Sequence, residues 1–251
     1  MIDNHIHIGQ YKDIYYEPKA ILSVVLESGV DELFFSSTTT CKNNIKYVKV
    51  EKEISNALSQ IGTMAIKTHP LLWYSPFFIK QGVLIDKAMN NLPYHGIKIH
   101  PFAHNWDISN TSIANLLHEI FDYANVNQLI VLIHTGEDSI CAANKFASFF
   151  TEYSKAKFIL AHGRPIKQTI DLLQKLPNVY CDTAFMPTKD IKAIVNNKLG
   201  KKVLLGSDFP ITHYYSLKTD KILNRYSIEK LKNQYAIDIE NMQYNESLLV
   251  K

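Results

Sequence analysis

Eight short apolar segments recur along the chain, and most are followed by a stretch in which apolar residues return every three or four positions. The segments lie at 1–9, 30–39, 63–70, 94–101, 129–136, 156–164, 178–185 and 201–210. Short apolar or β-branched segments bounded by Gly, Pro and Asn are typical of buried parallel strands, and the stretches between them have helical periodicity. The pattern therefore predicts eight strands that alternate with helices.

The spacing of these segments indicates the architecture. A polar residue stands at the end of each one, at intervals of 21 to 34 residues: His7, Thr38, His69, His100, His134, His162, Thr183 and Asp208. One βαβ unit takes about 30 residues, and a (β/α)₈ barrel takes about 250. The 251-residue chain has no Pro/Gly/Ser-rich linker, so we expect the α/β class and a single-domain TIM barrel spanning residues 1–251.

The segment after Pro210 has helical character. It contains SLKTDKILNRY and SIEKLKNQYAIDIENMQYNESLLVK. We expect these stretches to form the eighth barrel helix and a C-terminal closing helix.

Composition and charge narrow the class of protein. Hydrophobic residues make up 46% of the chain and charged residues 20%, and the net charge of +3 is spread along it; this favours a soluble globular protein without nucleic-acid or membrane partners. Cys41, Cys141 and Cys181 form no CxxC pair, which favours reduced thiols. No segment resembles a secretory signal or a membrane span, so we expect a cytoplasmic protein.

The candidate chemistry lies at the predicted strand ends, which form the functional rim of such a barrel. The residues placed there are His5, His7, His69, Lys98, His100, His134, His162 and Asp208. Because His5 and His7 are two residues apart on a strand, they project to one side, while Ile6 and Ile8 face the helices. A closed barrel sets strand eight beside strand one, so Asp208 should lie beside this pair. Imidazole and carboxylate groups together suit Zn²⁺, Mn²⁺ or Fe²⁺.

The segments MIDNHIHIG, GIKIHP, VLIHTG, ILAHGR and LLGSDFP, in this order, resemble the amidohydrolase superfamily. The resemblance is to its amidohydrolase-related (amidohydrolase 2) branch, which includes metal-dependent decarboxylases similar to the aminocarboxymuconate-semialdehyde enzyme. It covers essentially the whole chain. It implies metal ligation by His5, His7, His134 and Asp208, and it implies that His162 polarises or deprotonates the metal-bound water.

The expected chemistry follows from these ligands. A divalent ion lowers the pKa of a bound water toward ~7 and polarises a substrate oxygen. Asp208 can orient that water and accept its proton, and His162 can act as acid or base near neutral pH. We expect a metal-dependent hydrolase for an amide, ester or lactone of a small carboxylate-bearing or cyclic molecule, with Zn²⁺ favoured over Mn²⁺ or Fe²⁺ and one ion over two. Non-oxidative decarboxylation on the same site is the alternative.

Three further residues are candidates for substrate binding. Lys98 is open to three interpretations: a carboxylated bridge between two metals, a cation for a substrate carboxylate, or a salt-bridge partner. His100 is expected to contact substrate. Arg164 is one of two arginines, with Arg225, and lies two residues after His162; it fits bidentate carboxylate binding or a salt bridge that fixes its loop.

Other polar and aromatic residues have less specific interpretations. The loops after strands three and four contain Trp73, Tyr74, His104 and Trp106, which either line an apolar pocket or pack the loops. Cys181 and Asp182, on the seventh predicted strand, are interpreted as structural.

Three rival functions remain open from the sequence. One is a binuclear amidohydrolase with carboxylated Lys98. Another is a TatD-type deoxyribonuclease, a family that expects a glutamate where this chain has Lys98. The third is a non-catalytic metal-binding barrel. Under every enzyme hypothesis except the nuclease, the expected partner is a small-molecule substrate. The chain is also compatible with a homo-oligomer.

Overall fold

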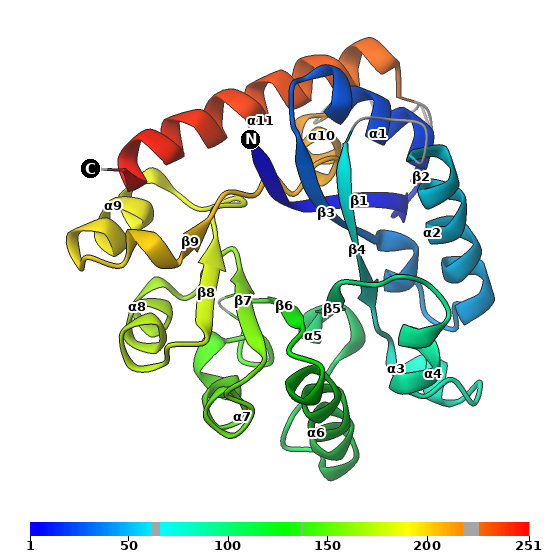
Figure 1. Ribbon diagram of the computed structural model, residues 1–251, viewed down its shortest axis with the longest axis vertical. Helices are drawn as coiled ribbons and strands as arrows, with labels where there is room; N and C mark the ends of the chain where they lie inside the picture. Colours follow the sequence, from blue (N-terminus) through cyan, green and yellow to red (C-terminus); the bar gives the residue numbers. More distant parts are fainter. Residues whose placement is uncertain (62–65, 137, 218–225, 251) are drawn as a thin grey trace.

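A curled parallel sheet surrounded by helices forms the body of the molecule in the computed structural model, which describes residues 1–61, 66–136, 138–217 and 226–250 (Figure 1). The strands are β1 (Ile2–Tyr11), β2 (Ile14–Tyr16), β3 (Glu32–Ser37), β4 (Lys67–Trp73), β5 (Gly96–Ile99), β6 (Ile130–His134), β7 (Lys157–Ala161), β8 (Val179–Asp182) and β9 (Val203–Leu204). Their order is β2-β1-β3-β4-β5-β6-β7-β8-β9. All neighbours are parallel except β1 and β2, which form an antiparallel hairpin.

Helices connect these strands on the outside of the sheet. The α-helices are α1 (Pro18–Glu27), α2 (Tyr47–Ile61), α3 (Pro76–Ile79), α4 (Ile85–Asn90), α5 (Pro101–His104), α6 (Thr111–Val126), α7 (Ala147–Glu152), α8 (Ile166–Lys175), α9 (Thr188–Asn196), α10 (Ile211–Ser216) and α11 (Ile228–Leu249). The described residues also form the 3₁₀-helices η1 (Thr38–Cys41), η2 (Ala143–Phe146) and η3 (Gly200–Lys202). The alternation of strand and helix confirms the predicted TIM barrel.

The barrel closes between β1 and the segment that follows β9. Ile6 forms a parallel bridge with Phe209. The backbone N–H of Asp208 donates to the carbonyl of His5 at 2.7 Å, and the N–H of His7 donates to the carbonyl of Phe209 at 2.7 Å. Residues about 200 positions apart in sequence are therefore held side by side, as the closed barrel requires.

Every predicted strand segment overlaps one parallel strand, but the third begins and ends later than expected. Residues 63–65 of that segment lie outside the described residues, and β4 runs on from Lys67 through Pro70 to Trp73. His69 is therefore near the start of β4, where its Nε2 lies 2.6 Å from Oε1 of Glu32, the first residue of β3. The prediction of His69 at the functional rim was wrong: Pro70 suggested a strand end, but the apolar sequence beyond it continues the strand.

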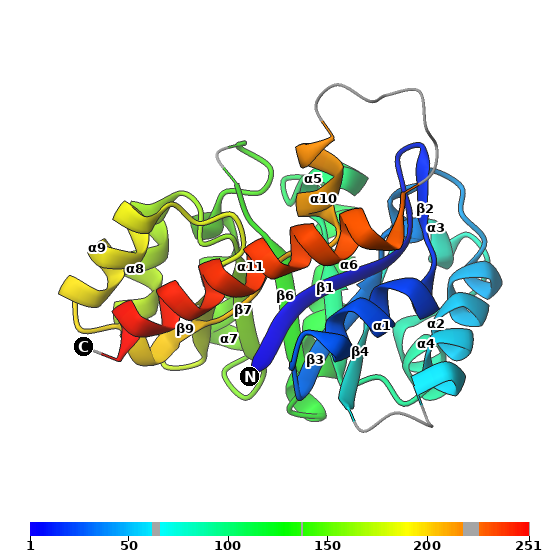
Figure 2. The ribbon, with the colours of Figure 1, turned by 90° about the horizontal axis from the view of Figure 1, so that it is seen from above.

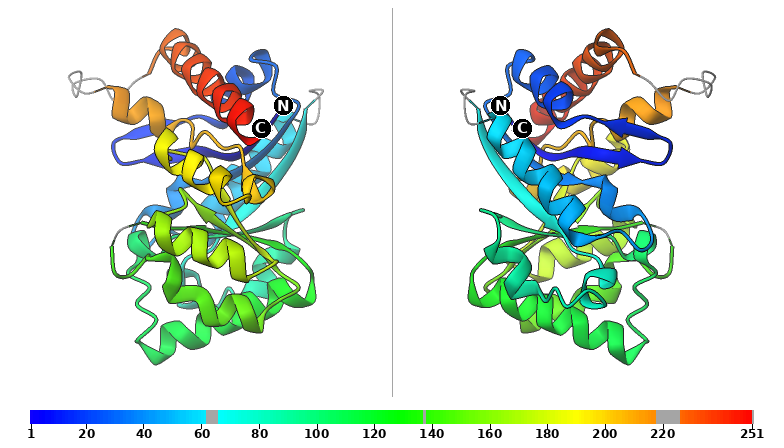
Figure 3. Two further views of the ribbon diagram at one scale, coloured as in Figure 1. Left: turned by 90° about the vertical axis from the view of Figure 1, so that its left-hand side faces the viewer. Right: turned by 90° about the vertical axis from the view of Figure 1, so that its right-hand side faces the viewer.

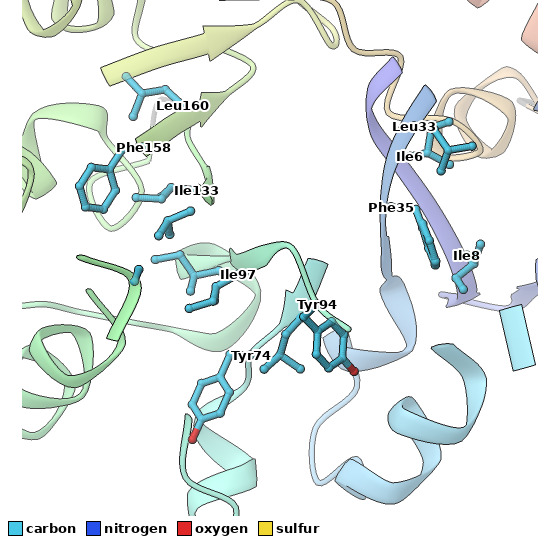
Figure 4. Close-up of a cluster of buried hydrophobic side chains, with 14 of the residues drawn as sticks. Ile6, Ile8, Leu33, Phe35, Tyr74, Tyr94, Ile97, Ile133, Phe158 and Leu160 are labelled. Atoms are coloured by element: carbon cyan, nitrogen blue, oxygen red, sulfur yellow. The ribbon is translucent and has the colours of Figure 1, made fainter. Parts of the chain in front are cut away.

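Two layers of apolar side chains stabilise the barrel. Outward-facing residues of the strands pack against the helices, and Figure 4 shows several of them, including Ile6, Ile8 and Phe35. Inside the barrel a smaller cluster contains Leu71, Leu132, Ile159 and Ala161. The alternation predicted for β1 is confirmed, because Ile6 and Ile8 are buried in the outer layer.

The C-terminal helix α11 closes the ring of helices. It packs against α1, α9 and α10, and Figure 2 shows it crossing the molecule alongside β1. The predicted closing helix is thus present. Most of the expected preceding helix, residues 218–225, lies outside the described residues. No helix in the part of the chain that the structure describes combines the length and the apolar character needed to cross a membrane.

The C-terminal ends of the strands lie at one side of the barrel. In Figure 2, α5 and α10, which follow β5 and β9, lie on the same side of the molecule. The β1–β2 hairpin extends beyond the ring of strands, as both views of Figure 3 show. This side carries the residues described next.

One buried carboxyl group in α11 should make the stability of the protein depend on pH. Asp238 accepts hydrogen bonds from Thr212 and Gln234, and burial raises its pKa to about 7. A carboxyl whose pKa is raised on folding stabilises the protein below its unfolded pKa and loses that contribution as pH rises through the folded value. Replacing it by Asn removes this titration, and the hydroxyl of Thr212 can reverse to accept.

The free energy of unfolding of the wild type should fall between pH 5 and pH 8. We expect Asp238→Asn to make this fall smaller by roughly 1–3 kcal/mol. Urea unfolding at several pH values measures it. The exposed Asp122→Asn, on α6, is the control and should leave the slope unchanged. Equal effects of Asp238→Asn at pH 5 and pH 8 would contradict the assignment.

Candidate metal centre

The side chains of His5, His7 and Asp208 converge at the C-terminal side of the barrel. Nε2 of His7 lies 2.9 Å from Oδ1 of Asp208, and Nε2 of His5 lies 3.5 Å from the same oxygen. All three residues are buried, and one ligand atom from each lies within 4.8 Å of the others. The structure thus brings together three of the four residues predicted as metal ligands.

A bulge in β1 contains His5. The register against β3 shifts between Asp3 and Ile6, which pair with Leu33 and Phe35. Such an extra residue re-aims the side chains at the bulge. The imidazole rings of His5 and His7 lie with their centroids 5.0 Å apart on the same side of the strand, as the alternation predicted.

The far nitrogen of each imidazole is held by another residue. Nδ1 of His5 lies 2.8 Å from Oδ2 of Asp182, and Nδ1 of His7 lies 3.0 Å from Oγ of Ser36. Metal-ligating histidines usually have their second nitrogen bonded in this way, which orients the ring. Both Nε2 atoms therefore face Asp208.

Burial keeps several of these imidazoles neutral. It lowers the pKa of His7 and of His162 to about 4, and it lowers the pKa of His134 and His100 well below the ordinary value. Burial would by itself raise the pKa of the Asp208 carboxyl, but the imidazoles of His5 and His7 hold it below its usual range. A metal ion requires this state, with neutral imidazole and ionised carboxylate.

One unsatisfied atom shows that the cluster fits a cation. Oδ1 of Asp208 is buried and faces two imidazole nitrogens, and it makes no well-directed hydrogen bond to any described residue. A buried carboxylate oxygen without a hydrogen bond is costly. A divalent ion shared by Asp208 and the two Nε2 atoms would satisfy it, and the mixed nitrogen and oxygen donor set suits Zn²⁺ or a neighbouring transition metal.

The fourth predicted ligand, His134, lies beside His162. Nδ1 of His134 is 3.1 Å from Nε2 of His162, and Nδ1 of His162 is 2.9 Å from the carbonyl of Ala184. A carbonyl only accepts, so His162 must be protonated at Nδ1. A neutral His162 then accepts at Nε2 from Nδ1–H of His134, which leaves Nε2 of His134 bare. His134 belongs to neither of the groups of potential ligands found among the described residues, which are His5–His7–Asp208 and His5–His162–Asp182.

Three flat side chains line one wall of the site. The ring of His100 stacks on that of His134, with centroids 3.7 Å apart, and on Trp73 at 5.3 Å; both pairs are tilted by 13°. Backbone N–H of Ala103 donates to Nδ1 of His100, which caps the short helix α5. These contacts hold the wall in place.

The two cationic side chains predicted to bind substrate, Lys98 and Arg164, occupy different positions. Nζ of Lys98 is buried at the floor, 3.2 Å from Nε2 of His5 and 5.8 Å from the Trp73 ring. Burial lowers its pKa to about 8, so it is mainly an ammonium at pH 7. Arg164 is half-buried at the rim, and its Nε has no hydrogen-bond partner among the described residues. No described acid forms an ion pair with it.

A cavity of about 390 Å³ joins these groups. Its lining includes all the residues predicted to bind metal, move a proton or bind substrate: His5, His7, Lys98, His100, His134, His162, Arg164 and Asp208. The other lining residues are Tyr11, Thr38, Cys41, Trp73, Phe185, Ile211 and Tyr215. Of the loop residues considered from sequence, only Trp73 lines it; Tyr74, His104 and Trp106 are buried elsewhere.

Sequence reasoning missed Asp182 and Ser36. Asp182 was interpreted as structural, yet it contacts the imidazole of His5, and Ser36 contacts that of His7. Their positions at or near the ends of predicted strands were the available signal. Cys181, its neighbour, is buried in the outer core, in agreement with a structural role.

Comparisons with known proteins agree with this geometry. A family model described as amidohydrolase matches residues 81–233, more than half of the chain; this stretch includes His134, His162 and Asp208. No curated protein matches the sequence.

Solved structures share the fold. A crystal structure described as an amidohydrolase II has a TM-score of 0.54 at 14% identity and covers 100% of this chain and 99% of its own. An N-acetylneuraminate lyase from Mycoplasma synoviae gives 0.53 at 13% identity over 98% and 84% of the two chains. A 2-keto-3-deoxygluconate aldolase from Picrophilus torridus gives 0.52 at 12% identity over 94% and 86%. At these identities the likeness shows the barrel alone, whereas the family match covers most of the chain: the protein belongs to the amidohydrolase family.

Proposed function

We propose that the protein is a metal-dependent hydrolase that cleaves an amide, ester or lactone of a small, carboxylate-bearing molecule. The observation that carries this is the buried Oδ1 of Asp208, which faces Nε2 of His5 and of His7 at the floor of the cavity without a well-directed hydrogen bond. Family membership supports the reaction class. The donor set of imidazoles and a carboxylate favours Zn²⁺.

The proposed metal ligands are His5, His7, Asp208 and His134. The first three converge, and the bare Nε2 of His134 would supply a fourth donor, for a set of three imidazoles and one carboxylate. A divalent ion bound there would polarise a substrate oxygen and lower the pKa of a water that it holds.

The chain supplies two groups that can move a proton. The carboxylate of Asp208 has its pKa held low by its imidazole neighbours, so it is ionised and can accept a proton from the attacking water. His162 is neutral, with Nδ1–H donated to the carbonyl of Ala184 and Nε2 accepting from Nδ1–H of His134. Once the contact with His134 is released, it can take up a proton at Nε2 and return it to the leaving group.

The remaining lining residues favour a small anionic substrate. The guanidinium of Arg164 faces the cavity and has no described acid to pair with, so a substrate carboxylate can bind it in bidentate fashion. The parallel rings of Trp73, His100 and His134 offer a flat wall for a planar group. Lys98 adds a buried cation at the floor.

Metal binding is the first test. After removal of metal by a chelator, we expect the protein to take up one tightly bound Zn²⁺ per chain, measured by metal analysis and calorimetry. Asp208→Asn should weaken binding by more than the about 10- to 100-fold that an outer-shell substitution costs. Glu32→Gln removes another carboxylate beside a histidine, at the opposite side of the barrel, and should not change it.

Activity is then measured with the metal-loaded protein on esters, lactones and amides, each with and without a free carboxylate. Products that have gained water support hydrolysis. Loss of CO₂ without gain of water would instead assign decarboxylation. A chain that binds no ion tightly, and that Zn²⁺ or Mn²⁺ does not activate, would contradict the proposal.

The role of Arg164 gives a separate prediction. Arg164→Ala should lower kcat/KM for carboxylate-bearing substrates by about 10- to 100-fold, because a hydrogen-bonded charge pair contributes roughly 1.5–3 kcal/mol. The uncharged analogues should be little affected. Lys167→Ala, an exposed cation on α8, is the control. Equal losses on charged and uncharged substrates would show that Arg164 only fixes its loop.

A further inference from the structure

The carboxylate of Asp182 contacts three donors from two parts of the site. Its Oδ2 lies 2.8 Å from Nδ1 of His5 on β1. Its Oδ1 accepts from the backbone N–H of His162 at 2.9 Å and of Ala184 at 3.1 Å. The side chain is completely buried, so these protein groups are what satisfies it.

These contacts determine where the proton sits on His5. An ionised carboxylate can only accept, so the contact at Oδ2 requires a proton on Nδ1 of His5. The other nitrogen gives independent support, because Nζ of Lys98 lies 3.2 Å from Nε2 and an ammonium can only donate. A neutral His5 is thus protonated at Nδ1 and bare at Nε2, the atom that faces Asp208.

The same carboxylate also fixes the loop that contains His162. His162 follows β7 with φ +69°, and its N–H and that of Ala184 would be unsatisfied in a buried site without Oδ1 of Asp182. We propose that Asp182 is a positioning residue that sets the Nδ1–H tautomer of His5, which frees Nε2 for a metal ion, and that anchors His162 beside it.

This assignment rests on the proposed metal centre but not on the identity of the reaction. It differs from direct ligation by Asp182, which the grouping of His5, His162 and Asp182 would also allow. In the hydrogen-bonded geometry both oxygens of Asp182 are already occupied by donors. The tautomer of His5 separates the two interpretations.

Asp182→Asn gives a sharp test because the backbone dictates how the amide is oriented. Two N–H groups face the Oδ1 position and one imidazole faces the Oδ2 position, so the Asn carbonyl should occupy the former and its NH₂ the latter. In the reversed orientation the NH₂ group would face the two buried backbone N–H groups, which would then have no acceptor. Each unsatisfied N–H would cost about 1–3 kcal/mol. The NH₂ then donates to Nδ1 of His5 and moves the ring proton to Nε2.

The first readout is the tautomer of His5 in metal-free protein, measured by ¹⁵N chemical shifts of labelled histidine and assigned with His5→Gln. We expect Nδ1–H in the wild type and Nε2–H in Asp182→Asn. Nε2–H in the wild type would overturn the proposal without any variant at Asp182.

The second readout is Zn²⁺ affinity by competition with a chelator of known affinity. Asp182→Asn should weaken it by about 10- to 100-fold while the fold, measured by circular dichroism and urea unfolding, stays close to that of the wild type. Asp182→Ala leaves the ring free to adopt either tautomer, so it should lose less affinity than Asp182→Asn but more stability, because two N–H groups lose their acceptor.

Asp238→Asn is the matched control: it also replaces a buried, hydrogen-bonded carboxyl, but one without contact to the imidazoles. It should leave both readouts unchanged. Loss of Zn²⁺ affinity in Asp182→Asn with His5 still protonated at Nδ1 would identify Asp182 as a direct ligand. Failure of the proposed hydrolysis would leave the tautomer result intact, so the two proposals are separable.

Discussion

The backbone hydrogen bonds that join β1 to residues 205–209 hold the candidate metal centre together. Asp208 donates from its N–H to His5, and His7 donates to Phe209, so the three converging side chains are attached to two directly bonded segments. Asp208 lies beyond the end of β9, so these backbone hydrogen bonds fix its position relative to the two histidines. A fixed backbone of this kind suits a group of ligands that must meet around one ion.

Burial gives this arrangement its electrostatic character. The same desolvation that keeps the imidazoles of His7, His134 and His162 neutral would make an unpaired carboxylate unfavourable. Asp208 therefore needs a positively charged partner. The hydrogen-bond contact of Lys98 is with His5 and not with Asp208. The centre combines bare imidazole nitrogens with an incompletely satisfied carboxylate oxygen, and this combination stabilises a cation better than either group alone would.

The periodicity of the sequence was sufficient to predict the barrel and the meeting of His5, His7 and Asp208, because strand alternation and closure follow from backbone geometry. It was not sufficient at His69, where Pro70 suggested a strand end and the strand in fact continues to Trp73. It also could not reveal the role of Asp182, since a hydrogen bond between residues 177 positions apart leaves no periodic signal. The position of His134 is similar: the sequence placed it on the correct strand end, but only side-chain geometry shows that it contacts His162.

Three side chains at the rim stand on backbone in the left-handed region. His162, Phe185 and Asp208 have φ values of +69°, +53° and +60°, and each of them follows a strand of the barrel and lines the cavity. This left-handed conformation favours glycine and costs other residues roughly 1–2 kcal/mol. A chain selected for stability alone would gain by placing glycine at these turns. Instead, the turns aim an imidazole, an aromatic ring and a carboxylate into one cavity, and strain of this kind is concentrated at functional sites. The conformational cost at the strand ends and the unsatisfied oxygen of Asp208 are thus two consequences of one arrangement, in which the barrel holds reactive groups in positions that folding by itself does not favour.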